Sequence, residues 1–255
     1  MHAKCTECTK HKFLLRQLTN DRLSFEAQSA EYQRHLARQY QDRCVYWQNR
    51  ALSRLGSLGP DGVRTVTIVL DGLDHTKCRY PRSLAMTAKE YDTFNRPCLD
   101  LHGVIAHGHL CLVALSEPWV PKDANWCCDL LGHTLHLLAE QIDLRVTRVI
   151  VQSDNTCREV KNNGCLRALA SWVGSGRLWA AEIHCLEKGH THEDIDAFFA
   201  GVCQHIESHS EIHVPEDFKA VLAKYLETAR QTEPMKVVEL VGSTRDWQLV
   251  SVGAC

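Results

Sequence analysis

Long runs of helix-forming residues occupy positions 13–55, which contain neither proline nor glycine. Such a stretch favours one long helix or a pair of helices. The segment from Gly56 to Gly62 reads GSLGPDG and is dense in turn-forming residues. We therefore predict a helical arm over residues 1–55 that ends at this turn, before a separate domain begins near residue 63.

Short apolar runs rich in β-branched residues follow the turn and indicate strands. Two of these runs are separated only by His107 and Gly108, which suits a tight hairpin. The predicted strands cover residues 65–70, 99–106, 109–115, 147–152 and 178–186.

Apolar residues at helical spacing indicate three helices that alternate with the later strands. Asp123 follows Pro121 and can cap the start of the first of them. The predicted helices cover residues 123–142, residues 158–173 and a stretch that begins near Thr191.

The predicted elements follow one another as three strands, a helix, a strand, a helix, a strand and a helix. This order predicts an α/β domain over residues 63–210, with a mixed five-stranded sheet flanked by helices. Residues 211–255 complete the chain as a C-terminal helix and tail. A strand-like run at 236–241 has no predicted place in the sheet.

Composition narrows the class of protein. The 255 residues are 44% hydrophobic and 24% charged, which is ordinary for a globular domain. Most of the 13 cysteines lie in apolar segments and suit reduced core residues better than disulfides. The sequence has neither an apolar run long enough to span a bilayer nor an apolar leader at its start. We expect an intracellular protein without a membrane partner, nuclear if its source is a eukaryote.

Charge is distributed unevenly along the chain. The formal net charge of −2 argues against a protein that coats nucleic acid by bulk electrostatics. Residues 1–55, however, contain ten Lys or Arg against five Asp or Glu. A surface that tracks a phosphate backbone is therefore expected on the arm.

Two aspartates stand directly after predicted strands, Asp71 after the first and Asp154 after the fourth. Gly72 lets another group approach Asp71 closely, and Asn155 and Lys161 follow Asp154. Each aspartate alone also suits a structural role, in a turn for Asp71 and as a helix cap for Asp154. A shared role requires strands one and four to be neighbours.

The segment 189–196, GHTHEDID, places two histidines and three carboxylates at the entry of the last predicted helix. An acidic first turn complements the helix dipole, which explains the carboxylates but gives no reason for the histidines. Groupings of histidine and carboxylate are typical of metal sites. His192 and Asp196 are four residues apart and share one helix flank, whereas Asp194 lies on the other. We predict that His192 and Asp196 act on one metal ion, with Asp196 as the third carboxylate ligand, and that Asp194 caps the helix or supports the site.

The element order, with carboxylates at the ends of strands one and four and at the start of the last helix, resembles the ribonuclease H and retroviral integrase fold. In that fold strands one and four are neighbours, so Asp71, Asp154 and Asp196 would converge. Carboxylates suit Mg²⁺ or Mn²⁺. Two such ions about 3.5–4 Å apart can activate the attacking oxygen and stabilise the leaving one in a displacement at phosphorus.

The sequence also resembles a transposon-associated family, the domain of unknown function 7869, over residues 5–208. The matching motifs are LDGLDHTK with the following Pro81-Arg82, QSDNTCREVKN, and GHTHEDID. This resemblance implies descent from a DDE/D-type transposase. The acidic positions it carries over are Asp71, Asp154 and the pair Asp194 and Asp196, with His190 and His192 alongside.

A second metal site is predicted near the N-terminus. Cys5 and Cys8 have the CxxC spacing of half a zinc site, and His11 lies nearby. Either His35 or Cys44 of the helical arm would complete the site for Zn²⁺.

Four basic residues near the acidic motifs are candidates for contacts with nucleic acid. Lys77, Arg79 and Arg82 follow the first motif, and Lys161 belongs to the second. They would touch phosphates close to the metal ions, although a solvated basic loop explains the first three equally well.

The leading hypothesis is a metal-dependent nuclease or strand transferase that acts on DNA, with a homo-oligomer left open. A second hypothesis keeps the fold without the activity, as a domesticated transposon-derived DNA-binding or scaffold protein. A third is a metal-dependent phosphatase for a small molecule, with His190 and His192 as ligands. The absence of a glycine-rich phosphate loop and the transposase-like strand order argue against the third.

Overall fold

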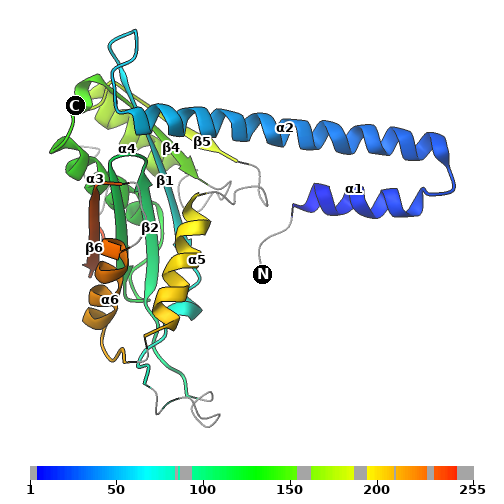
Figure 1. Ribbon diagram of the computed structural model, residues 1–255. Coiled ribbons are helices and arrows are strands. Elements are labelled where there is room, and N and C mark those ends of the chain that lie inside the picture. The colour runs from blue at the N-terminus through cyan, green and yellow to red at the C-terminus, as the bar shows by residue number, and fades with distance from the viewer. Residues whose placement is uncertain are drawn as a thin grey trace.

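The computed structural model describes residues 5–83, 86, 94–153, 162–186, 194–209, 211–228 and 233–245. Its N-terminal part is a pair of helices, α1 over Thr6–Gln17 and α2 over Arg22–Leu55. Asp21 caps the start of α2, and Gly56 ends it in the left-handed conformation that glycine adopts without steric cost. Figure 1 shows α2 extending far beyond the sheet, with α1 folded back alongside it.

The centre of the molecule is a six-stranded mixed sheet in the order β5-β4-β1-β2-β3-β6. β1, β2 and β3 form an antiparallel meander, whereas β4 pairs in parallel with β1 and β5 in parallel with β4. The predicted adjacency of strands one and four is confirmed, and the two strands run parallel. The strands are β1 (Arg64–Leu73), β2 (Asp100–Ala106), β3 (Leu110–Ser116), β4 (Thr147–Ser153), β5 (Ala180–Cys185) and β6 (Met235–Val241).

The prediction of five strands was wrong, because the described part of the chain contains a sixth. β6 is the run that the sequence left without a place, and it pairs in parallel with β3, Leu110 opposite Met235. An edge strand forms by pairing with a neighbour that can be distant in the sequence. The apolar pattern of the strand itself does not identify that neighbour.

Helices cover both faces of the sheet, α3 and α4 on one and α5 and α6 on the other (Figure 1). Successive residues of β1 alternate between the two cores: Ile68 and Leu70 pack with α3 and α4, whereas Val69 packs with α5 and α6. The helices are α3 (Ala124–Ala139), α4 (Asn163–Gly174), α5 (Asp194–Glu207) and α6 (Pro215–Thr228), with short 3₁₀ helices η1 (His75–Cys78) and η4 (Leu144–Val146).

Two helix boundaries differ from the predictions. α3 ends at Ala139 rather than at residue 142, and the described part of α4 begins at Asn163, after a predicted start at residue 158. The Asn162 side chain caps α4 by accepting a hydrogen bond from the Cys165 amide at 2.9 Å. No helix in the described ranges has both the length and the apolar character needed to cross a bilayer.

Candidate functional site

Asp71 lies inside β1 rather than after it, because the strand continues to Leu73. It pairs with Gly103 of β2, and its Oδ1 accepts a hydrogen bond from the Gly72 amide at 2.8 Å. Alternation along the strand puts Asp71 on the same face as Val69, the face that α5 covers. The carboxylate is therefore directed to the α5 side of the sheet, where it is partly exposed.

The first turns of α5 cross the sheet one strand away from Asp71. A Cβ atom on Gly103 would lie only 3.0 Å from Phe199 and 3.2 Å from Ile195, so the absence of a side chain lets α5 approach β2 closely. Neighbouring strands are about 4.8 Å apart. The first turn of α5, which contains Ile195 and Asp196, therefore lies over the part of the sheet that contains Asp71.

The two flanks of α5 face different neighbours. The rings of Phe198 and His205 lie tilted against Tyr225 of α6, so the flank that also carries Asp194 faces α6. The opposite flank carries Asp196 and Cys203. Glu207, one turn after Cys203, lies 3.7 Å from Lys77 of η1, so this flank lies beside the end of β1.

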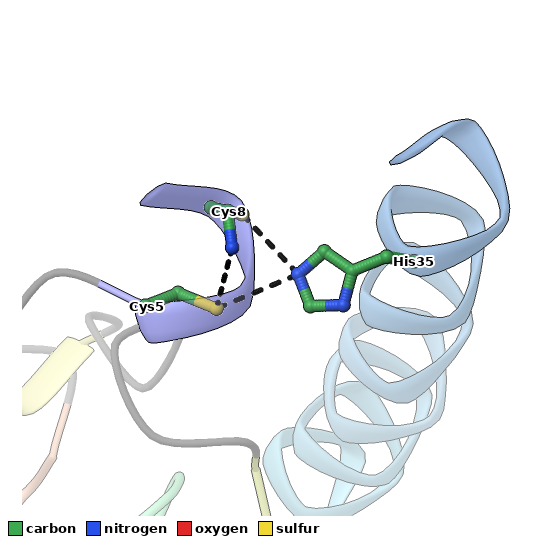
Figure 2. Close-up of side chains that lie close together, drawn as sticks. All are labelled: Cys5, Cys8 and His35. Atoms are coloured by element: carbon green, nitrogen blue, oxygen red, sulfur yellow. Dashed lines mark hydrogen bonds between the residues drawn. The ribbon is translucent and has the colours of Figure 1, made fainter. Parts of the chain in front are cut away.

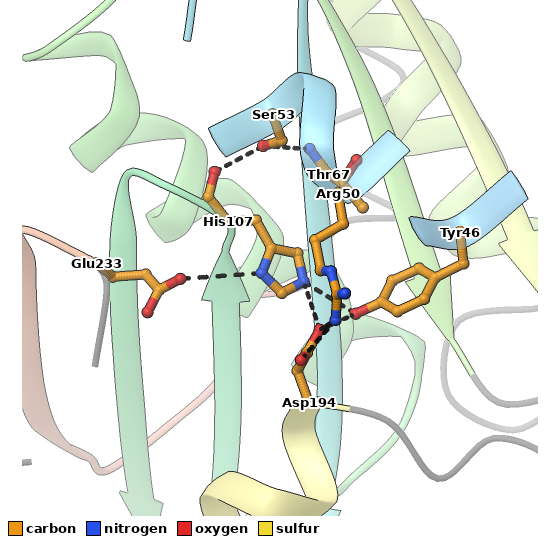
Figure 3. Close-up of polar contacts among 7 residues, drawn as sticks. All are labelled: Tyr46, Arg50, Ser53, Thr67, His107, Asp194 and Glu233. Atoms are coloured by element: carbon orange, nitrogen blue, oxygen red, sulfur yellow. Dashed lines mark hydrogen bonds and ion pairs between the residues drawn. The ribbon is translucent and has the colours of Figure 1, made fainter. Parts of the chain in front are cut away.

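Asp194 is bound by two side chains of the helical arm. Arg50 Nη1 of α2 lies 2.7 Å from both carboxylate oxygens, and the Tyr46 hydroxyl donates to Oδ2 at 2.8 Å. Figure 3 shows both α2 side chains directed at the start of α5. Burial alone would raise the pKa of Asp194, but the hydrogen bonds from Arg50 and Tyr46 outweigh it and hold this pKa below its usual value.

A buried histidine extends this network into the β2–β3 hairpin. His107 Nε2 lies 2.9 Å from the Tyr46 hydroxyl and 3.6 Å from Asp194, and its Nδ1 lies 3.8 Å from Glu233. Because the single hydroxyl proton of Tyr46 is donated to Asp194, His107 Nε2 must carry the proton that it shares with Tyr46. The arm, the hairpin and the start of α5 are thereby joined in one polar cluster.

The end of α2 is fastened to the sheet beside this cluster. Ser53 Oγ donates to the His107 carbonyl at 2.6 Å and accepts from the Thr67 amide at 3.0 Å. The predicted hairpin at residues 107 and 108 is confirmed, and Gly108 has a φ of 81°. A Cβ atom at Gly108 would lie 2.8 Å from Arg54 Cα, so glycine is required there for α2 to pack on the turn.

Sequence reasoning did not identify Tyr46, Arg50 and Ser53 as site residues. Their spacing puts them on one face of α2, which was the available signal. Their partners come from β1, the hairpin and α5, and a single helix pattern does not specify such distant contacts.

Several predicted site residues lie outside the described residues, namely Asp154, Lys161, His190 and His192. Among the basic residues near the first motif, Arg82 donates to the Ile206 carbonyl at 3.1 Å, and Lys77 lies 3.7 Å from Glu207. Lys77 and Arg79 are exposed. This loop is therefore joined to the end of α5 and presents two cations to solvent.

The N-terminal cysteines form a cluster with His35, as one of the two sequence-based alternatives predicted. Cys5 Sγ and Cys8 Sγ lie 3.5 Å and 3.2 Å from His35 Nε2. The three donor atoms lie within 4.8 Å of one another, a grouping that can hold a metal ion. Figure 2 shows the two cysteines at the start of α1 facing the imidazole from α2. Cys44 is not part of this group among the described residues.

Comparison of the chain with curated proteins and with solved structures gave no significant match. A family profile does match, over residues 89–249. This match begins after Asp71 and extends through β6, whereas the sequence motifs indicated a resemblance over residues 5–208. It includes Asp154, the 189–196 segment and the helices and strands that follow. Since the match spans more than half of the chain, the protein belongs to the family named domain of unknown function DUF7869.

Proposed function

We propose that the protein is a ribonuclease-H-like, transposase- or integrase-like nuclease or strand transferase that acts on DNA with two divalent metal ions. Asp71, Asp154 and Asp196 are the proposed metal ligands. Asp194 is assigned instead to holding α5 against the arm, because Arg50 and Tyr46 engage its carboxylate.

The strand arrangement supports this proposal. An antiparallel meander of three strands, followed by two strands that add in parallel beside β1, gives the order β5-β4-β1-β2-β3. That order is the one expected of a ribonuclease-H-like domain. β6 then extends the sheet at the β3 edge, away from the proposed site.

The register between β1 and β4 is the observation that carries the proposal. Val69 pairs with Gln152, and positions 71 and 154 each come two residues later in the sequence. Asp154 lies outside the described residues, but it follows Ser153, the last residue of β4, in the sequence. Parallel strands end at the same edge of a sheet, which favours convergence of the two carboxylates.

The residues present fit a hard divalent cation. Asp71 and Asp196 are partly exposed carboxylates on the α5 side of β1, and carboxylate oxygens are preferred ligands of Mg²⁺ and Mn²⁺. Such ions, when bound, supply an activated water or hydroxyl and stabilise the leaving oxygen. The exposed Lys77 and Arg79 would hold the phosphate backbone near this edge.

The N-terminal group of Cys5, Cys8 and His35 is assigned to Zn²⁺ in this proposal. Thiolates are soft ligands and select zinc over magnesium or manganese. The two metal sites therefore have different chemistry and different roles.

A plasmid-nicking assay with Mn²⁺ tests the nuclease assignment. We expect the wild-type chain to convert supercoiled DNA to nicked DNA. The rate should fall at least about 100-fold in each of three variants, Asp71→Asn, Asp154→Asn and Asp196→Asn. The reason is that changes in residues that only support metal ligands already cost about 10–100-fold. Asp217→Asn is the matched control, because it makes the same charge change at the start of α6, where the carboxylate accepts amide hydrogen bonds that asparagine can keep.

Two outcomes would contradict the assignment. Full activity in the Asp71 or Asp154 variant would exclude these carboxylates as ligands. Binding of DNA without any metal-dependent cleavage by the wild-type chain would favour the inactive, domesticated DNA-binding protein instead.

A further inference from the structure

We infer that metal binding at Cys5, Cys8 and His35 fastens α1 to α2, and that Glu7 orients His35 for this role. The inference rests on the zinc assignment proposed above. It concerns the helical arm and is independent of the nuclease site.

The distances within the cluster match those between ligands of one tetrahedral zinc ion. With Zn–S bonds of about 2.3 Å and Zn–N bonds of about 2.0–2.1 Å, a tetrahedron separates a sulfur and a nitrogen ligand by roughly 3.6 Å. The two Sγ–Nε2 distances here are 3.5 Å and 3.2 Å. Small side-chain adjustments would therefore suffice to admit the ion.

A carboxylate lies beside the second nitrogen of His35, the place where metal-bound histidines commonly have one. Glu7 Oε2 lies 2.9 Å from His35 Nδ1, and the imidazole is only 1% exposed. A carboxylate at Nδ1 fixes the ring orientation and leaves Nε2 free of a proton to bind a metal. Glu7 stands between Cys5 and Cys8 in the first turn of α1, so one turn supplies two ligands and the orienting group.

The surroundings of the thiols favour a bound cation. Cys5 Sγ accepts a hydrogen bond from the Cys8 amide at 3.4 Å, at a helix N-terminus that stabilises negative charge. His35 Nε2 completes a group of three donor atoms within 4.8 Å of one another, close enough for one divalent cation to bind all three. A bound cation would hold both thiols as thiolates, because it deprotonates the thiols that it binds.

The packing of α1 gives the metal a structural role. α1 has 12 residues and none of them is buried, so apolar contacts contribute little to its attachment. An isolated helix of this length is marginally stable in water. Cys5, immediately before the helix, and His35, in the middle of α2, are buried, so the cluster forms a buried junction between the two helices (Figure 2).

Hydrogen exchange of the full-length chain, with Zn²⁺ bound and after chelation, tests the inference. We expect one zinc ion per chain by elemental analysis, and at least about tenfold faster exchange of the α1 amides once zinc is removed, with α2 little changed. Cobalt substitution should give a sulfur-to-cobalt charge-transfer band that the Cys5→Ser and Cys8→Ser changes abolish. Cys44→Ser, which alters another α2 cysteine outside the cluster, should keep the metal.

Glu7→Gln tests the orienting role separately. We expect it to weaken zinc binding about 10–100-fold while leaving the cobalt band in place at saturating metal. Unchanged zinc affinity in this variant would overturn the role of Glu7.

The remaining outcomes separate the inference from the zinc assignment. Cysteine-dependent zinc binding with unchanged α1 exchange would overturn the inference and leave the assignment intact. A wild-type chain that takes up neither Zn²⁺ nor Co²⁺, or a Cys5–Cys8 disulfide detected by mass, would overturn both.

Discussion

The ion pair between Arg50 and Asp194 should be a measurable part of the stability of the domain, and Asp194→Asn is the change that tests it. The substitution keeps the size of the side chain and removes its charge. It leaves the Arg50 guanidinium, only 24% exposed, without the carboxylate that it binds through two 2.7 Å contacts. Asp196→Asn, two residues along the same helix, makes an equal charge change outside this pair and serves as the control.

The expected loss follows from the burial of the two groups. Exposed ion pairs contribute about 0–1 kcal/mol, whereas breaking a fully buried pair costs about 3–5 kcal/mol. Side chains that are 24% and 27% exposed lie between these limits, so we expect a loss of about 2 kcal/mol in the free energy of unfolding. For a chain of this size that lowers the Tm by about 4–8 °C.

The pH dependence provides a second expectation. The pKa of Asp194 is lowered in the folded state, so its contribution is complete above the unfolded value of about 3.9 and is lost as the pH falls through the lower folded value. The difference between the wild-type chain and Asp194→Asn should therefore shrink below about pH 4.

Urea unfolding of the wild-type chain, Asp194→Asn, Arg50→Met and the double variant is the assay. We expect the sum of the two single losses to exceed the loss measured for the double variant by about 1 kcal/mol or more. Losses that add within about 0.3–0.5 kcal/mol would refute a direct interaction between arm and α5.

Two further predictions concern the β2–β3 hairpin and the pH range. Gly108→Ala should destabilise the domain by more than about 2 kcal/mol in urea unfolding, because a left-handed φ and a 2.8 Å approach to Arg54 Cα act together. Gly176, which also has a left-handed φ of 70° but open space around it, is the control, and Gly176→Ala should lose only about 1 kcal/mol. Equal losses in the two variants would contradict the packing argument. Burial lowers the pKa of His102 to about 4, so the unfolded chain binds a proton at a higher pH than the folded one. The wild-type chain should therefore lose about 3 kcal/mol of stability as the pH falls from 6.5 to 4. His102→Gln should lose less over that range if the histidine is responsible.

The sequence was sufficient for the elements whose pattern is local. The 107–108 hairpin and the apolar stripe of α5 follow from runs of a few residues, and the structure contains them. The adjacency of β1 and β4 was instead expected from the resemblance of the element order to the ribonuclease H fold, and the structure contains it too. The CxxC motif likewise indicated a metal site, although the choice of His35 over Cys44 depended on how α1 folds back along α2.

Contacts between distant elements were beyond the sequence pattern. β6 pairs with β3 although most of the domain's sequence lies between them. Asp194 is likewise held by Arg50 and Tyr46 of the arm, which precede it by more than a hundred residues. Apolar periodicity indicates which face of a helix or strand is buried, but it does not identify the element that covers that face. Helical spacing alone placed Asp194 and Asp196 on different flanks of α5, but the partners of Asp194 were identified only once the position of α2 was known.

Anomalous diffraction from crystals grown with Mn²⁺ tests the central claim most directly, because it locates bound manganese without relying on activity. We predict anomalous peaks between Asp71 and Asp196 at the β1 and β4 edge, two of them within about 4 Å if both ions bind without substrate. Manganese bound elsewhere, or no peak beside Asp71 at a saturating concentration, would contradict a two-metal nuclease built on these carboxylates.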